Sequence, residues 1–170
     1  MLFTVHVAGR KQLELCERMS EIFHSGAWHS NTFNVYTGGT FDLFHRGHVN
    51  FLFQCRMLAN GGRVTVGLNT DEFAESYKRK PVCNLAERIA VVEACRYVDD
   101  VAVNWGGGDS KPLIEHVAPD VIAVGDDWRD KDYYGQMGFT QEWLDKHGIQ
   151  VMFLPYTKGI SSSDIIGRLK

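Results

Sequence analysis

Short apolar runs rich in β-branched residues alternate with amphipathic runs along the chain from Phe33 onward. The short runs predict five strands, at residues 34–37, 63–68, 98–103, 120–124 and 149–154. Between and after them, apolar residues at helical spacing predict helices that begin near residues 46, 85, 110, 140 and 162. Strands that alternate with helices favour a parallel sheet covered on both faces. We therefore expect an α/β fold, a Rossmann-like, doubly wound parallel sheet of five strands.

Residues typical of helix ends flank several of these runs. Asn84 and Glu87, three residues apart, resemble a capping box at the start of one helix. Pro112 lies in the first turn of another, where a missing N–H costs little. Gly61 and Gly148 follow the ends of two more helices, as glycines at helix C-termini do. These signals support the helical assignments.

Residues 1–31 differ from the rest of the chain. They contain one short possible helix, at residues 11–24, followed by a stretch rich in helix-breaking residues. The start lacks a basic segment followed by a long apolar one, so no secretory signal is expected. We expect a single domain at residues 32–170 and, at residues 1–31, an extension of unknown role. It would pack on the domain or on a partner subunit, or form a loosely ordered leader.

The composition excludes several classes of protein. Of the 170 residues, 44% are hydrophobic and 23% charged, which is ordinary for a folded domain. Lysine and arginine number 18 against 21 aspartate and glutamate residues, a net charge of −3. Proteins that grip long nucleic acids usually carry a basic excess, so no nucleic-acid partner is expected. No apolar run is long enough to span a bilayer.

The four cysteines are spaced unlike those of zinc ribbons or thioredoxin-like proteins, because no two form a CxxC pair. They are Cys16, Cys55, Cys83 and Cys95. Reduced, partly buried thiols are typical of a cytosolic protein, so we expect a cytoplasmic location.

The segment after the first predicted strand carries the strongest candidate chemistry. Gly38 and Gly39 allow the backbone to approach a ligand closely. His45 and His48 follow at the start of a helix, with Gly47 between them. A helix start favours bound phosphate, and two imidazoles there can donate hydrogen bonds to phosphate oxygens. The alternatives are two solvated surface histidines, or a metal pair that lacks further ligands.

Residues 39–48, GTFDLFHRGH, resemble the GTFDxxHxGH signature of the cytidylyltransferase-like nucleotidyltransferases. Four further stretches occur in the order of that family, at residues 69–73, 96–101, 125–128 and 159–162. Together they resemble its glycerol-3-phosphate cytidylyltransferase branch, and the similarity covers the chain from about residue 33 to its end.

The resemblance implies transfer of CMP from CTP to a small phosphorylated alcohol, with glycerol 3-phosphate expected first, and release of pyrophosphate. Mg²⁺ is expected with the triphosphate, but the sequence shows no protein cage for it. A homodimer is also expected. The alternatives are transfer from ATP, another acceptor such as a sugar phosphate or FMN, and a nucleotide-binding module without catalysis.

The resemblance also implies roles for individual residues. The expected catalytic residues are His45, His48, Lys78 and Arg79. The expected nucleotide contacts are Thr40, Phe41, His45, Arg46, Gly47, His48, Arg79, Asp126, Trp128, Thr157, Lys158, Gly159, Ile160, Ser161, Ser162 and Ser163. The expected substrate contacts are Lys78, Arg88 and Lys111. No protein metal ligand is expected.

Several of these residues also have a simpler explanation. The basic run after the second strand can be a solvated surface segment, the C-terminal serines an ordinary helix cap, Trp128 a cover for the sheet edge and Arg88 a surface side chain. Tyr77 and Tyr156 occupy positions that are usually basic in the family. Lys78 and Lys158 are expected to supply the missing charges.

Overall fold

The computed structural model describes residues 32–129 and 131–169. The predicted extension at residues 1–31, with its possible helix at 11–24, lies outside the described residues.

The domain is built on a sheet of five parallel strands. Along the chain these are β1 (Val35–Gly39), β2 (Val64–Asn69), β3 (Asp100–Asn104), β4 (Val121–Gly125) and β5 (Gln150–Leu154). Their order in the sheet is β3-β2-β1-β4-β5. The chain therefore builds outward in one direction from β1 and then in the other. β1 and β4 are neighbours where the direction changes, and they pair only at their first residues, Val35 with Val121 and Tyr36 with Ile122. Open α/β sheets bind ligands beyond the carboxyl ends of the strands at such a point.

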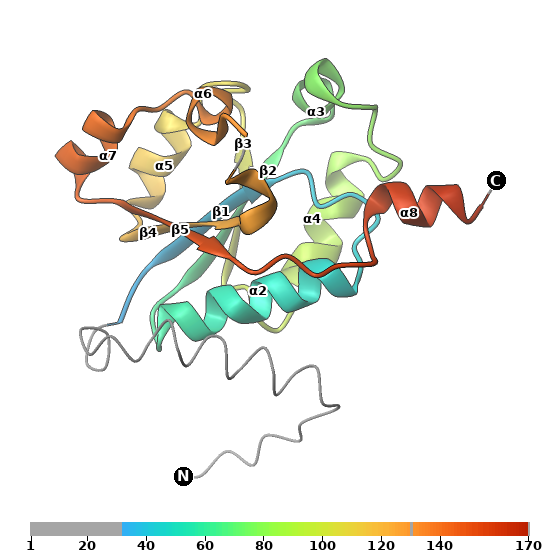
Figure 1. Ribbon diagram of the computed structural model, residues 1–170, viewed down its shortest axis with the longest axis horizontal. Coiled ribbons are helices and arrows are strands. Elements are labelled where there is room, and N and C mark those ends of the chain that lie inside the picture. The colour runs from blue at the N-terminus through green and yellow to red at the C-terminus, as the bar shows by residue number, and fades with distance from the viewer. Residues whose placement is uncertain (1–31, 130, 170) are drawn as a thin grey trace, which may run out of the picture. The chain divides into compact units, whose positions relative to one another are not determined.

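Helices cover both faces of the sheet, which confirms the doubly wound fold (Figure 1). One face carries α2 (Arg46–Ala59) and α4 (Leu85–Glu93). The other carries α5 (Lys111–Val117), α6 (Tyr133–Met137) and α7 (Gln141–His147). The shorter elements are α3 (Asp71–Tyr77), the 3₁₀ turn η1 (Asp126–Trp128) and α8 (Ser162–Gly167).

Alternate residues of the central strands supply two apolar cores. Tyr36 and Ile122 pack with Ile114 and Leu144 on the face covered by α5, α6 and α7. On the other face, Val66 and Leu68 of β2 pack with α2 and α4. Burial on both faces explains why the sequence of β2 reads as a nearly continuous apolar run.

Most of the predicted helix ends are confirmed. Asn84 and Glu87 form a capping box at the start of α4. Thr140 caps α7, and Gly148 ends it in a left-handed conformation. Ser161 caps α8. The sequence did not predict the short elements α3, η1 and α6, and these three line the pocket described below.

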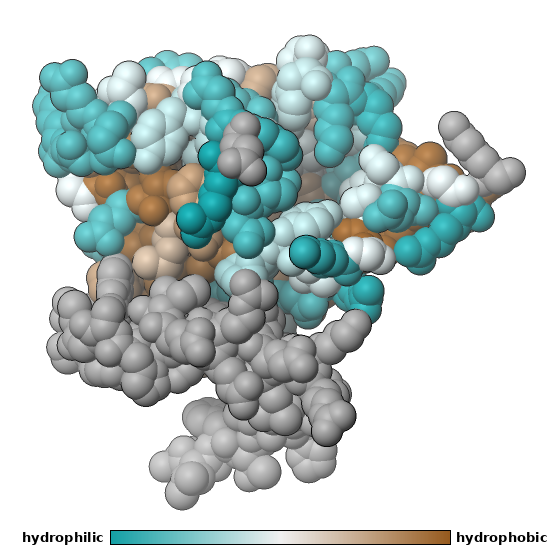
Figure 2. All heavy atoms as spheres, viewed as in Figure 1, coloured by the Kyte–Doolittle hydropathy of each residue, from teal (hydrophilic) through white to brown (hydrophobic). Residues whose placement is uncertain are grey.

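In the view of Figure 2, polar side chains cover the molecule around α3, α6 and α7, and apolar side chains show through near β5. Val151 and Phe153 of this edge strand are partly buried against the adjacent core. Within residues 32–129 and 131–169, no helix is both long and apolar enough to cross a bilayer.

Candidate active site

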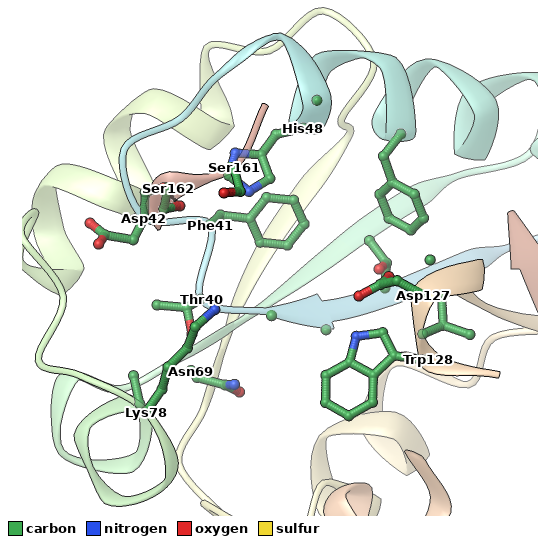
Figure 3. A pocket seen from close by; sticks show the side chains of 18 of the residues that line it. Thr40, Phe41, Asp42, His48, Asn69, Lys78, Asp127, Trp128, Ser161 and Ser162 are labelled. Carbon is green, nitrogen blue, oxygen red and sulfur yellow. Dashed lines mark hydrogen bonds between the residues drawn. The ribbon is translucent and has the colours of Figure 1, made fainter. Parts of the chain in front are cut away.

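A cavity of about 540 Å³ opens at the carboxyl ends of β1, β2 and β4 (Figure 3). Its walls come from four segments: the β1–α2 turn, the loop that follows α3, η1 with α6, and the start of α8. In Figure 3, Phe41 of the β1–α2 turn and His48 at the start of α2 project over the cavity, opposite Asp127 and Trp128. A volume of this size suits a small-molecule ligand.

The β1–α2 turn has an unusual backbone that three other contacts hold in place. Phe41 and Leu43 have φ angles of 52° and 47°, in a region that costs a non-glycine residue of order 1 kcal/mol. Between them, the carboxylate of Asp42 accepts hydrogen bonds from the N–H groups of Val82 and Cys83. The hydroxyl of Ser162 donates to the carbonyl of Asp42 at 2.7 Å. The turn is thus tied both to the loop after α3 and to the C-terminal segment.

His45 and His48 form a reciprocal cap at the start of α2. His45 Nδ1 accepts from the N–H of Gly47 at 3.1 Å, and His48 Nδ1 accepts from the N–H of His45 at 3.3 Å. The rings stack with centroids 3.9 Å apart. Gly47 leaves room for this, because a Cβ there would lie 2.9 Å from the His45 ring. Both Nδ1 atoms are acceptors, so each neutral ring carries its proton on Nε2.

Both imidazoles are neutral at pH 7. Burial lowers the pKa of His48 to about 3, and the neighbouring His45 contributes to the decrease. Burial also lowers the pKa of His45 below its ordinary value of 6.5. The pair therefore offers Nε2–H donors without carrying a full positive charge.

The low pKa of His48 should make the stability of the domain depend on pH. The unfolded chain protonates this ring near pH 6.5, whereas the folded state keeps it neutral down to about pH 3. Between these values the free energy of unfolding should fall as the pH falls, by at most about 1.4 kcal/mol per unit from this residue. Urea unfolding at pH 7, 5 and 4 would measure the slope. The His48→Asn variant should have a shallower slope, and an unchanged slope would contradict the assignment.

Lys78 and Arg79 were both expected to act on the ligand, but their surroundings in the structure differ. Arg79 pairs with the buried carboxylate of Asp42 at 2.8 Å. Lys78 lines the cavity, and its ammonium has no hydrogen bond or ion pair within the described part of the chain. Figure 3 shows its side chain extending toward Thr40. Lys78 is therefore an unpaired cation of this loop that lines the cavity, and the charge of Arg79 is largely neutralised.

The paired carboxylate of Asp42 is ionised at neutral pH. Burial raises its pKa, but the N–H groups of Cys83 and Val82 and the guanidinium of Arg79 outweigh this effect and lower the pKa below its ordinary value. The Asp42–Arg79 pair thus fixes the loop after α3 against the β1–α2 turn.

The wall formed by η1 places Asp127, rather than Asp126, at the cavity. Asp127 lines it and pairs with Lys131 at 3.2 Å, and the Lys131 ammonium lies 4.8 Å from the centre of the Trp128 ring. The carboxylate of Asp126 instead accepts from the N–H of Tyr156 at 2.8 Å, outside the cavity. The structure therefore places the neighbour of the predicted Asp126 at the cavity, because the tight turn η1 directs successive side chains in different directions.

The C-terminal segment brings hydroxyl groups to the cavity. Thr157, Ser161 and Ser162 line it, together with Tyr156. The predicted contacts Lys158, Gly159, Ile160 and Ser163 do not. Ile160 is buried, and its methyl group would lie 3.2 Å from a Cβ at Gly47. Its contribution is therefore to packing under the first turn of α2.

Arg88 and Lys111 were expected to contact the substrate, and in the structure each is bonded to other parts of the protein. The side chain of Arg88 is 1% exposed and is bonded entirely within the protein. The ammonium of Lys111 donates to the carbonyl of Gly138 at 2.5 Å and pairs with Asp109 at 3.0 Å. Neither residue lines the cavity.

Arg46, expected to bind the nucleotide, is exposed at the first position of α2 and does not line the cavity either.

Sequence reasoning missed several cavity residues, among them Asn69, Lys131, Tyr133, Gln136 and Met137. A polar residue at the end of a buried strand was the available signal for Asn69. The residues of α6 gave no such signal, because a helix of five residues is too short to show a period.

Within residues 32–129 and 131–169, no three histidine, cysteine, aspartate or glutamate side chains lie together as a metal site. Of the cavity carboxylates, Asp42 is occupied by Arg79 and backbone groups, and Asp127 is paired with Lys131. The side chains around this cavity therefore do not fit an all-protein cage for a divalent cation.

The family model described as "Cytidylyltransferase-like" matches residues 36–168. The chain is 35% identical over 133 residues to a glycerol-3-phosphate cytidylyltransferase of Bacillus subtilis, which covers 77% of this chain and 92% of that one. It is 37% identical over 125 residues to an FAD synthase of Thermococcus kodakarensis, covering 72% of this chain and 79% of that one.

Two other relatives are much longer. The chain spans 27% of a bifunctional protein HldE of Nitrosococcus oceani and 23% of an ethanolamine-phosphate cytidylyltransferase of Mus musculus. Among solved structures, a lipopolysaccharide core biosynthesis protein of Thermoplasma volcanium aligns with a TM-score of 0.60 at 24% identity. That alignment covers 76% of this chain and 100% of the other, and it supports the fold alone.

Proposed function

Since the chain belongs to the cytidylyltransferase-like family of nucleotidyltransferases, we propose that it transfers CMP from CTP to a small phosphorylated alcohol, first of all glycerol 3-phosphate. The observation that carries this proposal is the stacked pair His45 and His48, whose Nε2–H donors lie at a cavity together with the unpaired ammonium of Lys78.

The proposed reaction is an in-line displacement at phosphorus. A phosphate oxygen of the acceptor forms a bond to the α-phosphorus of CTP. The bond from that phosphorus to the oxygen bridging the α- and β-phosphates breaks, and pyrophosphate leaves with the electron pair. Such transfers require positioning and charge stabilisation rather than a covalent enzyme intermediate.

Neutral histidines suit this reaction. A phosphate monoester has a second pKa near 6, so at pH 7 the acceptor oxygen already lacks its proton and requires no general base. His45 and His48 can then serve as Nε2–H donors to phosphate oxygens that gain charge in the transition state. Lys78 supplies the full positive charge, and the hydroxyl of Thr40 a further donor, at the same cavity.

For the base, we propose that Asp127 accepts a hydrogen bond from the exocyclic amino group of cytosine, beside the indole of Trp128. Adenine also carries an exocyclic amino group, so this carboxylate does not by itself select CTP over ATP. A second candidate for the reaction also has an observation in its favour. The similarity to an FAD synthase, with an aromatic wall of Trp128 and Tyr133, supports adenylyl transfer to FMN.

We also propose that Mg²⁺ enters with the triphosphate, which it binds through phosphate oxygens and water, and that the enzyme works as a homodimer. When bound, the ion would neutralise phosphate charge. No step above is assigned to it.

A substrate panel tests the proposed function. The protein would be incubated with Mg²⁺ and each of CTP, ATP, GTP and UTP, paired with glycerol 3-phosphate, ethanolamine phosphate or FMN, and pyrophosphate release would be measured. We expect CTP with glycerol 3-phosphate to exceed every other pair by at least about 10-fold in kcat/KM. The His48→Asn protein, prepared in the same way, controls for contaminating enzymes. Faster turnover of ATP with FMN would replace the proposal with the second candidate.

A further inference from the structure

Tyr77 joins two strand ends at the cavity. It is the last residue of α3, and its ring packs against Phe73 with centroids 5.1 Å apart. Its hydroxyl lies 3.1 Å from Thr40 Oγ1, just past the end of β1, and 3.1 Å from Asn69 Nδ2, at the end of β2. Thr40, Asn69 and Tyr77 all line the cavity. This tyrosine occupies a position where the sequence resemblance leads one to expect a basic residue.

One backbone carbonyl sets the direction of the hydrogen bonds from Asn104 to Asn69 and from Asn69 to Tyr77. The carbonyl of Gly107 can only accept, so the atom of Asn104 that faces it at 2.9 Å is the donor Nδ2. The same Nδ2 donates to Asn69 Oδ1 at 3.2 Å, which leaves Asn69 Nδ2 facing Tyr77. Asn69 and Asn104 are 8% and 1% exposed, so solvent competes little for the bond between them.

Counting protons then defines the role of Tyr77. The amide of Asn69 can only donate to the tyrosine oxygen, so the single O–H proton of Tyr77 is available to Thr40. When Tyr77 donates to Thr40 Oγ1, the proton of Thr40 is directed away from Tyr77 and is free for a ligand. An anionic phosphate in the cavity favours this arrangement, because it needs donors.

Thr40 is held from its other side as well. Its carbonyl accepts from Arg88 Nη1 at 2.7 Å, and the same guanidinium donates to the carbonyl of Asn69 at 2.8 Å. Arg88 thus fixes the backbone of Thr40, and Tyr77 fixes its side chain.

We propose that Tyr77 is a positioning residue, which accepts from Asn69 and donates to Thr40 so that the Thr40 hydroxyl donates to a ligand phosphate. This inference rests on the proposed function only in that the cavity takes a phosphate chain. A lysine at position 77 could not perform this role. An ammonium only donates, and it would leave the Asn69 amide without its acceptor.

A double-mutant cycle with inorganic tripolyphosphate as the probe tests the proposal. Tripolyphosphate lacks both base and acceptor, so its binding, measured by titration calorimetry, does not depend on which substrates the enzyme uses. Tyr77→Phe keeps the ring that packs on Phe73 and removes only the hydroxyl. We expect Tyr77→Phe and Thr40→Val each to weaken binding by about 3- to 10-fold. The double variant should bind no more weakly than Thr40→Val alone.

Tyr134→Phe is the matched control. It removes a phenol that also bonds to an amide side chain, that of Gln141 at 3.0 Å, but Tyr134 does not line the cavity. This variant should bind tripolyphosphate like the wild-type protein. If the fold-losses in tripolyphosphate binding of the two single variants multiply in the double variant, the proposal is overturned. Unchanged binding by Tyr77→Phe would overturn it as well, and so would a wild-type protein that does not bind tripolyphosphate. If the effects on tripolyphosphate binding do not multiply but the enzyme does not turn over CTP, the role of Tyr77 stands and only the proposed substrates are refuted.

Discussion

Replacing His48 with asparagine should lower kcat for pyrophosphate release by about 10²- to 10³-fold, the usual effect of removing one donor to a developing oxyanion. An asparagine Oδ1 can occupy the place of the imidazole Nδ1 and so keep the hydrogen bond from the N–H of His45 that caps α2. The Nε2–H that we propose donates to the ligand is lost. The variant should therefore be folded but nearly inactive, as steady-state kinetics and thermal unfolding together would measure.

Two further variants control for this result. His48→Gln loses the cap but extends an amide donor toward the position of Nε2, so it should be less stable than His48→Asn and more active. His116→Ala, which removes an exposed histidine of α5, should leave kcat unchanged. Equal activity of the asparagine and wild-type proteins would show that the ring of His48 takes no part in the transfer.

The fold could be predicted because its determinants are local. The strands are short apolar runs, and residues such as Asn84, Thr140 and Ser161 mark helix starts within three residues of the groups they bond. The histidine pair was also visible, since its spacing and neighbouring Gly47 lie in one continuous segment. The sequence did not reveal that His45 is itself the helix cap, which depends on the backbone conformation of the turn.

The fate of each cation could not be predicted, because its partner is distant in sequence. Lys78 and Arg79 are adjacent and similar in charge, yet Arg79 is neutralised by Asp42, 37 positions earlier, and Lys78 is not. Arg88 looked like a surface or substrate-binding residue on an amphipathic helix. Its burial depends on four acceptors from three segments that meet only in the folded domain. The sequence thus showed where charged residues gather, but not which of them remain unpaired in the folded domain.

The buried position of Arg88 predicts the largest effect on stability. Its guanidinium donates to Thr40, Asn69 and Cys83 carbonyls and pairs with Asp71 at 2.6 Å. Arg88→Met would keep much of the side-chain volume but leave these acceptors, one of them charged, without their donor. We expect a loss of about 3–5 kcal/mol in the free energy of unfolding, measured by urea denaturation. The midpoint of thermal unfolding should fall by roughly 10 °C or more.

An exposed arginine–aspartate pair provides the matched control for this prediction. Arg63 also bonds an aspartate, Asp100, through two nitrogen atoms, but its side chain is 64% exposed. Arg63→Met should therefore leave the midpoint nearly unchanged, because water replaces the lost partner. Arg88→Lys should resemble Arg88→Met more than wild type, since one ammonium cannot reach four acceptors in a planar arrangement. If Arg88→Met and Arg63→Met destabilise the domain equally, the guanidinium of Arg88 does not hold the ends of β1 and β2 together, and Thr40 must be fixed by other contacts.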